Sequence, residues 1–157
     1  MPKEIERKFL VDKTHPELQA ILTGDGIKVQ QGYLKSDEQG VVRARLYGDM
    51  GYLTVKGPTV GVTRDEFEYE IPAVDARAML KSMCGAIVSK TRYLVPIDGS
   101  GSLVFEIDVF DDIDLTIAEI ELPSEDTDFT RPEWLGQDVS HDPSYYNNAI
   151  AERLKPA

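Results

Sequence analysis

EIERKFLV, residues 4–11, alternates in character with the two-residue period of a β-strand. One face of this strand would carry Glu4, Glu6 and Lys8, and the other would carry Ile5, Phe9 and Val11, with Arg7 among them. An apolar face predicts packing against a core, and the charged face of a single strand most simply predicts contact with water. The same arrangement recurs in most of the later predicted strands, so it bears on the whole fold.

Seven further segments have the composition and periodicity of strands, and six of them also carry a charged face. They span residues 27–35, 41–47, 51–57, 63–71, 87–95, 102–110 and 116–122. Short links such as DEQG, GDMG and DGSG predict hairpins between antiparallel neighbours. The sequence therefore predicts an α+β domain with eight mostly antiparallel strands, which are enough to close a barrel.

Four helices are predicted between and after these strands. The first begins with Thr14 as its N-cap and Glu17 completing a capping box, and it ends by Gly24. A second helix begins with Asp75 as its cap and closes at Gly85. The remaining assignments are a terminal helix over 144–154, a short helix starting at 124–126 and an irregular segment over 132–143.

Length, charge and cysteine content bound the class of protein. A chain of 157 residues predicts one domain, residues 1–157, and no apolar run approaches the roughly 20 residues of a membrane span. The net charge of −11 argues against non-specific nucleic-acid binding. It leaves room for a small anionic ligand, because local charge decides within a screening length of about 8–10 Å. Cys84 is the only cysteine, which fits a cytoplasmic location, and its apolar surroundings predict a packing role.

The charged faces separate by sign along the chain. Arg43 shares a face with Arg45, as Lys90 does with Arg92. Two like charges about 6 Å apart repel by roughly 2–3 kcal/mol at an effective dielectric constant of about 20, so grouped cations need compensating anions. A polyanion such as a phosphate chain would explain the grouping, since Arg binds phosphate oxygens in a bidentate manner and Lys supplies a point charge. The complete basic set would be Lys8, Arg43, Arg45, Lys56, Lys90 and Arg92.

The carboxylates need a second explanation, because acids crowded around a bare phosphate chain would repel it. Clustered carboxylates hold hard divalent cations, and Mg²⁺ is commonly shared between carboxylates, water and phosphates. The candidate ligands are Glu4, Glu6, Asp108, Glu119 and Glu121. Two arrangements remain open from the alternation alone. In one, a sheet covers its apolar face with helices and turns the charges to water; in the other, a barrel encloses the charges in a tunnel.

Several motifs, in order along nearly the whole chain, resemble those of the CYTH superfamily, the triphosphate tunnel metalloenzymes. EIERKF at 4–9 is similar to the ExExK signature of that family. The others are QGYL (31–34), RARL (43–46), TVKG (54–57), EFEYEI (66–71), KTRY (90–93), FEIDVF (105–110), EIEL (119–122), WLGQDVS (134–140) and the pair Tyr145 and Asn147. This resemblance implies an eight-stranded antiparallel tunnel that binds triphosphate with Mg²⁺ or Mn²⁺.

The resemblance also implies roles for individual residues. The basic set above would hold the phosphates, and the five carboxylates would bind one or two metals, with the metal beside Glu4 activating a water for attack. Lys90 and Tyr33 would correspond to a catalytic pair that manages the leaving-group proton. Glu66, Glu68 and Glu70 would orient basic residues through salt bridges, while Trp134, Gly136 and His141 would belong to a structural loop closing on the barrel. Relatives often carry a lysine in the terminal helix, where Tyr146 and Asn148 stand here, which leaves contacts to the far end of the substrate open.

Known members of the family act on inorganic triphosphate, thiamine triphosphate or nucleoside triphosphates, and fold alone does not choose among these. This chain is short, with no evident insertion for an organic group, which favours inorganic triphosphate (tripolyphosphate) as the substrate. The enzyme alternatives are thiamine triphosphatase and class IV adenylyl cyclase, and the non-enzyme alternative is a polyphosphate- or nucleotide-binding protein. The expected partner is a small polyanion, with no nucleic acid and no membrane, and the sequence leaves a homodimer open.

Overall fold

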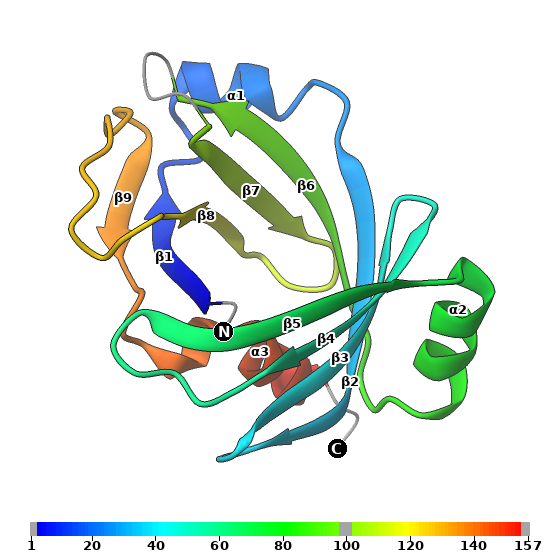
Figure 1. The fold of residues 1–157 in the computed structure, drawn as a ribbon. Helices are drawn as coiled ribbons and strands as arrows, with labels where there is room; N and C mark the ends of the chain where they lie inside the picture. Colours follow the sequence, from blue (N-terminus) through cyan, green and yellow to red (C-terminus); the bar gives the residue numbers. More distant parts are fainter. Residues whose placement is uncertain (1–2, 98–101, 155–157) are drawn as a thin grey trace.

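The computed structural model describes residues 3–97 and 102–154, and its centre is a closed antiparallel β-barrel (Figure 1). The eight barrel strands are β1 (Lys3–Val11), β2 (Ile27–Asp37), β3 (Gly40–Tyr47), β4 (Met50–Lys56), β5 (Thr63–Ile71), β6 (Val88–Pro96), β7 (Val104–Phe110) and β8 (Thr116–Glu121). Their order around the barrel is β5-β4-β3-β2-β6-β7-β8-β1, and a further β5–β1 pairing closes the ring. The α+β class and the eight predicted strands are therefore confirmed, while the predicted turn at 98–101 lies outside the described residues.

The first strand, β1, closes the barrel by pairing on both of its edges. Along one edge it pairs with β8 from Glu6 to Leu10. Along the other edge it pairs with β5 at residues 3–5 and then with a ninth strand, β9 (Leu135–Asp138), at Phe9 and Val11. A single strand thus joins the first, middle and last parts of the chain.

Apolar side chains on the outer faces of the strands are covered by helices and loops. Phe9, Phe105 and Ile120 pack with Trp134 and with Leu18 of α1 (Pro16–Ile21). Ala44 and Leu46 of β3 pack beneath α2 (Ala73–Ser82), which lies outside the barrel in Figure 1. The hydrophobic core therefore surrounds the barrel instead of filling it.

The terminal helix α3 (Asn147–Arg153), preceded by a 3-10 turn over Pro143–Tyr145, closes one end of the barrel. Ile150 and Ala151 of α3 pack against apolar residues of β6, β7 and β8, among them Phe110. No helix of the described part of the chain has the length and apolar character that a membrane span requires.

Four local predictions differ from the structure. The N-cap of α1 is His15, whose Nδ1 accepts a bond from the Glu17 amide at 3.2 Å, because the Thr14 hydroxyl donates to Asp12 instead. Pro72 precedes α2 without a side-chain cap, and Asp75 lies in the first turn. Residues 124–126 form no helix, and the segment predicted to be irregular contains β9.

Candidate active site

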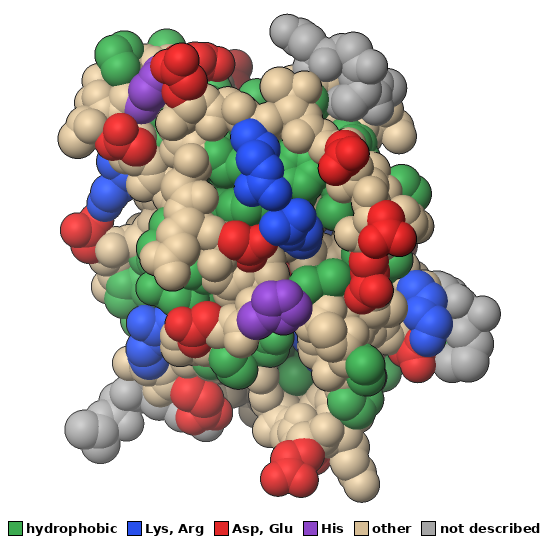
Figure 2. Space-filling view, turned by 90° about the vertical axis from the view of Figure 1, so that its left-hand side faces the viewer, with side chains coloured by type: hydrophobic (Ala, Val, Ile, Leu, Met, Phe, Trp, Pro, Cys, Tyr) green, Lys and Arg blue, Asp and Glu red, His purple; other side chains and the backbone are tan. Residues whose placement is uncertain are grey.

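The inner faces of the barrel strands enclose a cavity of about 220 Å³. Its carboxylates are Glu4, Glu6, Glu66, Glu68, Glu106, Glu119 and Glu121. Its cations are Lys8, Arg43, Arg45, Lys56, Arg64 and Arg92. The charged faces thus converge inside the barrel, as the tunnel prediction required. On the exterior, Figure 2 shows basic and acidic side chains scattered over the side that carries β9.

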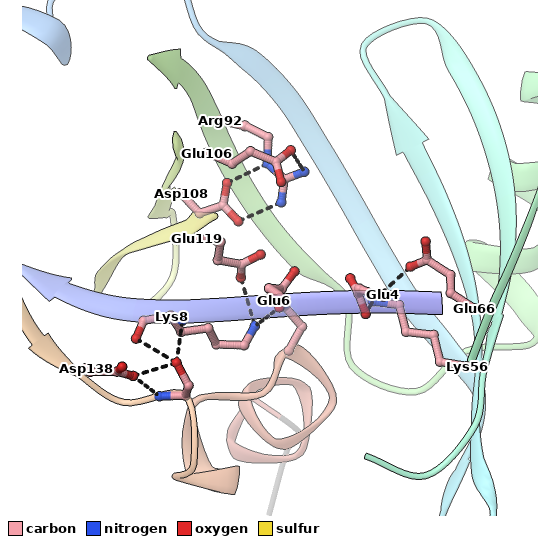
Figure 3. Close-up of polar contacts among 12 residues, drawn as sticks. Glu4, Glu6, Lys8, Lys56, Glu66, Arg92, Glu106, Asp108, Glu119 and Asp138 are labelled. Carbon is pink, nitrogen blue, oxygen red and sulfur yellow. Dashed lines mark hydrogen bonds and ion pairs between the residues drawn. The ribbon is translucent and has the colours of Figure 1, made fainter. Parts of the chain in front are cut away.

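The β1 residue Glu4 anchors the first group of charges (Figure 3). Both of its carboxylate oxygens accept bonds from Lys56 Nζ, at 2.9 and 2.8 Å. Lys56 also lies 3.3 Å from Glu66 of β5. Burial raises the pKa of Glu4, but the ammonium of Lys56 outweighs it and leaves that pKa below its usual value. Glu4 therefore stays ionised, and the expected orienting role of Glu66 toward a basic residue is confirmed.

Lys8, at the other end of the same row, lies between two acids (Figure 3). Its Nζ is 2.9 Å from Glu119 Oε1 and 3.0 Å from Glu6 Oε1. Burial acts to lower the pKa of Lys8, but Glu119 and Glu6 raise it above the ordinary lysine value. Lys8 is therefore a permanent positive charge that separates two candidate metal ligands.

The wall formed by β3 carries more positive charge than its neighbours neutralise. Arg43 and Arg45 both pair with one carboxylate, Glu68, at 3.4 and 3.2 Å. Burial and the repulsion of Arg43 and Arg92 lower the pKa of Arg45 to about 10. Among the described residues, the Nε atoms of both arginines are buried without a hydrogen-bond partner, as are both amide atoms of Gln31. Unpaired buried donors beside grouped guanidinium ions favour an anionic occupant.

Glu68 orients its arginines as expected, whereas exposed Glu70 forms no ion pair within the described part of the chain.

The opposite wall, formed by β1, β7 and β8, carries surplus negative charge. Strand register places Glu6 directly across from Glu121, and Glu106 across from Glu119. Burial and the carboxylates of Glu4, Glu66 and Glu106 raise the pKa of Glu121 to about 7. Burial and the charge of Glu119 likewise raise the pKa of Glu6 well above its usual range. Like charges facing each other across a strand pair are destabilising, so this wall is suited to bind cations.

The acidic wall fits a hard divalent cation by the chemistry of its donors. Carboxylate oxygens are the ligands that Mg²⁺ and Mn²⁺ prefer. Across residues 3–97 and 102–154, no three Asp, Glu, His or Cys side chains are already gathered as a metal site. The acids instead bond to lysines and arginines, so a cation would share Glu6 and Glu119 with Lys8.

Two predicted site residues, Lys90 and Asp108, are fully buried on the same strand faces as the cavity residue Arg92. Their side chains are 0% exposed, and Lys90 Nζ lies 2.7 Å from Asp108 Oδ2. Asp108 also accepts two bonds from Arg92, at 2.8 and 2.9 Å. Neither residue is among the described residues that line the cavity. Arg92, which does line it, therefore connects this buried cluster to the site.

Tyr33 lines the cavity, but the described contacts do not join it to Lys90. Lys90 Nζ instead donates to Asn147 Oδ1 of α3 at 3.1 Å. Asn148, at a position where relatives often carry lysine, lines the cavity and donates to the Ser36 hydroxyl at 3.0 Å. The predicted Lys90–Tyr33 pair is thus brought to the same end of the barrel without direct contact.

Several residues that line the cavity were missed as site residues from the sequence. Arg64 and Glu106 have the same alternation as the predicted charged faces, so the pattern itself contained the signal for them. Ser140 and Tyr146 come from segments without strand periodicity; the family resemblance included both segments, but neither residue was given a role at the site.

Comparison with known proteins agrees with this geometry. The CYTH domain model matches residues 2–148. An inorganic triphosphatase of Acetivibrio thermocellus is 39% identical over 155 residues, covering 97% of this chain and 95% of that protein. An inorganic triphosphatase of Nitrosomonas europaea is 36% identical over 156 residues, covering 94% of this chain and 96% of that protein.

Solved structures give the same result. The crystal structure of an inorganic triphosphatase matches with a TM-score of 0.63 and 33% identity, covering 96% of this chain and 95% of that one. A putative adenylate cyclase of Bacillus halodurans shares the fold alone, with a TM-score of 0.52 and 21% identity over 80% of this chain and 84% of that one. A family model matching nearly the whole length, together with relatives above 35% identity, shows that the chain belongs to the CYTH domain family.

Proposed function

We propose that this chain is an inorganic triphosphatase that hydrolyses tripolyphosphate inside the barrel with the help of Mg²⁺ or Mn²⁺. The observation that carries the proposal is one enclosed cavity in which a basic wall faces an acidic wall. A phosphate chain needs the first wall, and the cations that accompany it need the second. The names of the two relatives support the same activity.

Each wall has a proposed role. Arg43, Arg45, Lys56, Lys8 and Arg92 bind the phosphate oxygens. Glu4, Glu6, Glu119 and Glu121 hold one or two divalent cations, and Tyr33, which lines the cavity, manages a proton on the leaving group. When bound, the cation supplies positive charge against the phosphate oxygens and acidity for the attacking water.

The buried cluster of Lys90 and Asp108 has a different proposed role. Lys90 and Asp108 act on the site through Arg92, whose guanidinium Asp108 fixes with two bonds. Direct contact of Lys90 with substrate requires the Asn147 bond and the Asp108 pair to open, so the role of Lys90 in catalysis is proposed as conditional on that movement.

The cavity favours the inorganic chain over its organic relatives. Charged side chains dominate its lining. The lysines, arginines and glutamates described above suit phosphate and cations rather than a nucleotide base or a thiazole ring. Thiamine triphosphatase, class IV adenylyl cyclase and a polyphosphate- or nucleotide-binding protein remain the alternatives that an assay must separate.

Phosphate release from tripolyphosphate, thiamine triphosphate and ATP, each with Mg²⁺, Mn²⁺ or EDTA, tests the proposal. We expect metal-dependent turnover of tripolyphosphate well above that of the other two. Cyclic AMP formed from ATP would make the protein a cyclase, and tight binding of tripolyphosphate without turnover would make it a binding protein.

The proposal extends to location and partners. The single cysteine supports a cytoplasmic location, and the ligand is expected to be a small polyanion. A homodimer stays a prediction, which light scattering of the purified protein would test.

A further inference from the structure

Strand pairing along one edge of β1 is interrupted between residue 5 and Phe9, in the stretch where Glu6 and Lys8 face the cavity. On that edge β5 pairs only with residues 3–5, and β9 pairs only at Phe9 and Val11. Within the gap, the Lys8 amide donates to the hydroxyl oxygen of Ser140 at 2.9 Å, in place of a carbonyl of a neighbouring strand. A side chain therefore holds the backbone of Lys8.

Ser140 is itself fixed by Asp138. The Ser140 amide donates to Asp138 Oδ1 at 2.8 Å, and the Ser140 hydroxyl donates to the same oxygen at 2.5 Å. The other oxygen of Asp138 accepts a bond at 3.1 Å from Nε of Arg7, the residue that precedes Lys8 in the chain. The Val139 amide completes the contact by donating to the Lys8 carbonyl at 2.8 Å. The backbone N–H and C=O of Lys8 on this edge are thus bound by Ser140 and Val139.

These contacts lie directly at the cavity. Ser140 is 5% exposed and lines the cavity, and Lys8 is 7% exposed. The Lys8 ammonium lies between Glu6 and Glu119 at 3.0 and 2.9 Å, so a shift of its backbone changes both distances. Residues 138–140 can therefore affect the position of the Lys8 ammonium through their bonds to the Lys8 backbone.

We propose that Asp138 and Ser140 are positioning residues for Lys8, holding the ammonium where it binds the phosphate chain of a linear polyphosphate. This inference rests on the proposed function. Attachment of β9 to the barrel does not depend on the pair, because Trp134 is buried in the core and its carbonyl accepts a 2.8 Å bond from the Asp12 amide. Loss of the Ser140 hydroxyl should therefore leave a folded protein with a misplaced Lys8.

The chain supplies a matched control four residues further on. The Ser144 amide and hydroxyl donate to Asp142 Oδ1 at 3.0 and 2.7 Å, which repeats the local bonds of the Asp138–Ser140 pair. Ser144 is exposed, and its described side-chain bonds do not reach β1. Ser140→Ala and Ser144→Ala thus remove the same local bond, and only the first also removes the bond to Lys8.

Steady-state kinetics with tripolyphosphate and Mg²⁺ test the proposal. We expect Ser140→Ala to raise KM about five- to tenfold, in the range of one lost hydrogen bond to a buried group, and to change kcat less. Ser140→Thr, which retains the hydroxyl, should restore KM to within about twofold, and Ser144→Ala should leave it unchanged. An unchanged KM in folded Ser140→Ala, or an equal change in Ser144→Ala, would overturn the proposal.

A double-mutant cycle with Lys8→Ala separates positioning from a general loss of structure. Where Lys8 has no ammonium, Ser140→Ala should cause no further rise in KM, because its effect passes through that group. Additive effects would refute a role through Lys8. Calorimetric titration with tripolyphosphate repeats the comparison without turnover. A wild-type protein that binds tripolyphosphate without hydrolysing it would refute the proposed function. The positioning role would still be tested in that case, because it predicts a lower affinity for tripolyphosphate in Ser140→Ala.

Discussion

Asp108 is the carboxylate on which two cations of the barrel wall depend. It pairs with Lys90 and with Arg92, and all three side chains are at least nine-tenths buried. Removing one partner of a buried ion pair is far more costly than removing an exposed one, because the other charge stays buried and uncompensated.

We therefore expect Asp108→Asn to lower the free energy of unfolding by about 3–5 kcal/mol. Glu106→Gln is the matched control, because Arg92 keeps its two bonds to Asp108 when Glu106 Oε2, 2.8 Å away, is neutralised. The control should lose about 1 kcal/mol or less. Urea unfolding of the ligand-free proteins measures both values, and equal losses would contradict the central place given to Asp108.

The two walls of the cavity predict different kinetic effects. Arg45→Ala removes a cation that faces the proposed phosphate chain, so KM should rise and kcat should fall. Glu4→Ala removes a proposed metal ligand near the attacking water, so the main effect should be a fall in kcat. Initial rates across a range of tripolyphosphate concentrations at saturating Mg²⁺ distinguish the two patterns. Wild-type kinetics in both variants would rule out the site.

At the scale of elements, the barrel strands were predictable and β9 was not. The barrel strands were predicted from the alternation of their residues, because one face of each strand packs in the outer core and the other faces the charged interior. LGQD, the sequence of β9, has no such alternation, and its pairing with β1 depends on contacts more than 120 residues apart in sequence. The cap of α1 was misassigned for a local reason, because Asp12, two residues away, accepts the bond from the Thr14 hydroxyl that would otherwise cap the helix.

Close approach of β9 to β1 leads to a prediction about Gly136. A Cβ added at this position would lie 2.9 Å from the Leu10 carbonyl oxygen, which belongs to the backbone and cannot move aside cheaply. Gly136→Ala should therefore lower the free energy of unfolding by about 1–3 kcal/mol. Gly57→Ala is a suitable comparison, because its nearest contact would be 3.6 Å, an ordinary packing distance. Thermal unfolding should show a lower Tm for the first variant and little change for the second.

For the whole molecule, alternation predicted which faces turn inward but not how deep each residue lies. Arg45 and Lys90 share the same kind of face, yet Arg45 lines the cavity and Lys90 is fully buried against Asn147 of α3. Depth depends on the shear of the closed barrel and on α3, neither of which is encoded in the periodicity of a single strand. The same limit explains why Ser140 was missed, since its place at the cavity follows from the gap along β1.

The acidic wall predicts how stability depends on pH. Because the pKa of Glu121 is raised from 4.5 to about 7, the native protein binds a proton between these values that the unfolded chain does not. Raising pH through this window must therefore reduce stability. The raised pKa values of Glu6 and Glu106, caused first by burial, act in the same direction.

We expect the Tm in EDTA to fall between pH 5 and pH 7.5. Mg²⁺ or Mn²⁺ should raise the Tm more at pH 7.5 than at pH 5, because the carboxylates are ionised at the higher pH. Glu121→Gln should make the fall shallower. A Tm that rises over this interval to the same extent in both proteins would show that other groups govern the response.

The double pairing of β1 has a consequence for biosynthesis. This strand leaves the ribosome before the other barrel strands, but its partners Glu119 and Glu121 emerge more than 110 residues later. A nascent chain can assemble the hairpins of β2–β5 while residues 6–10 of β1 wait for β8, so loop closure over most of the polypeptide comes last. Translation products that stop before β8 would possess the arginine-bearing strands and lack Glu119 and Glu121, so activity should emerge only after β8 has been made.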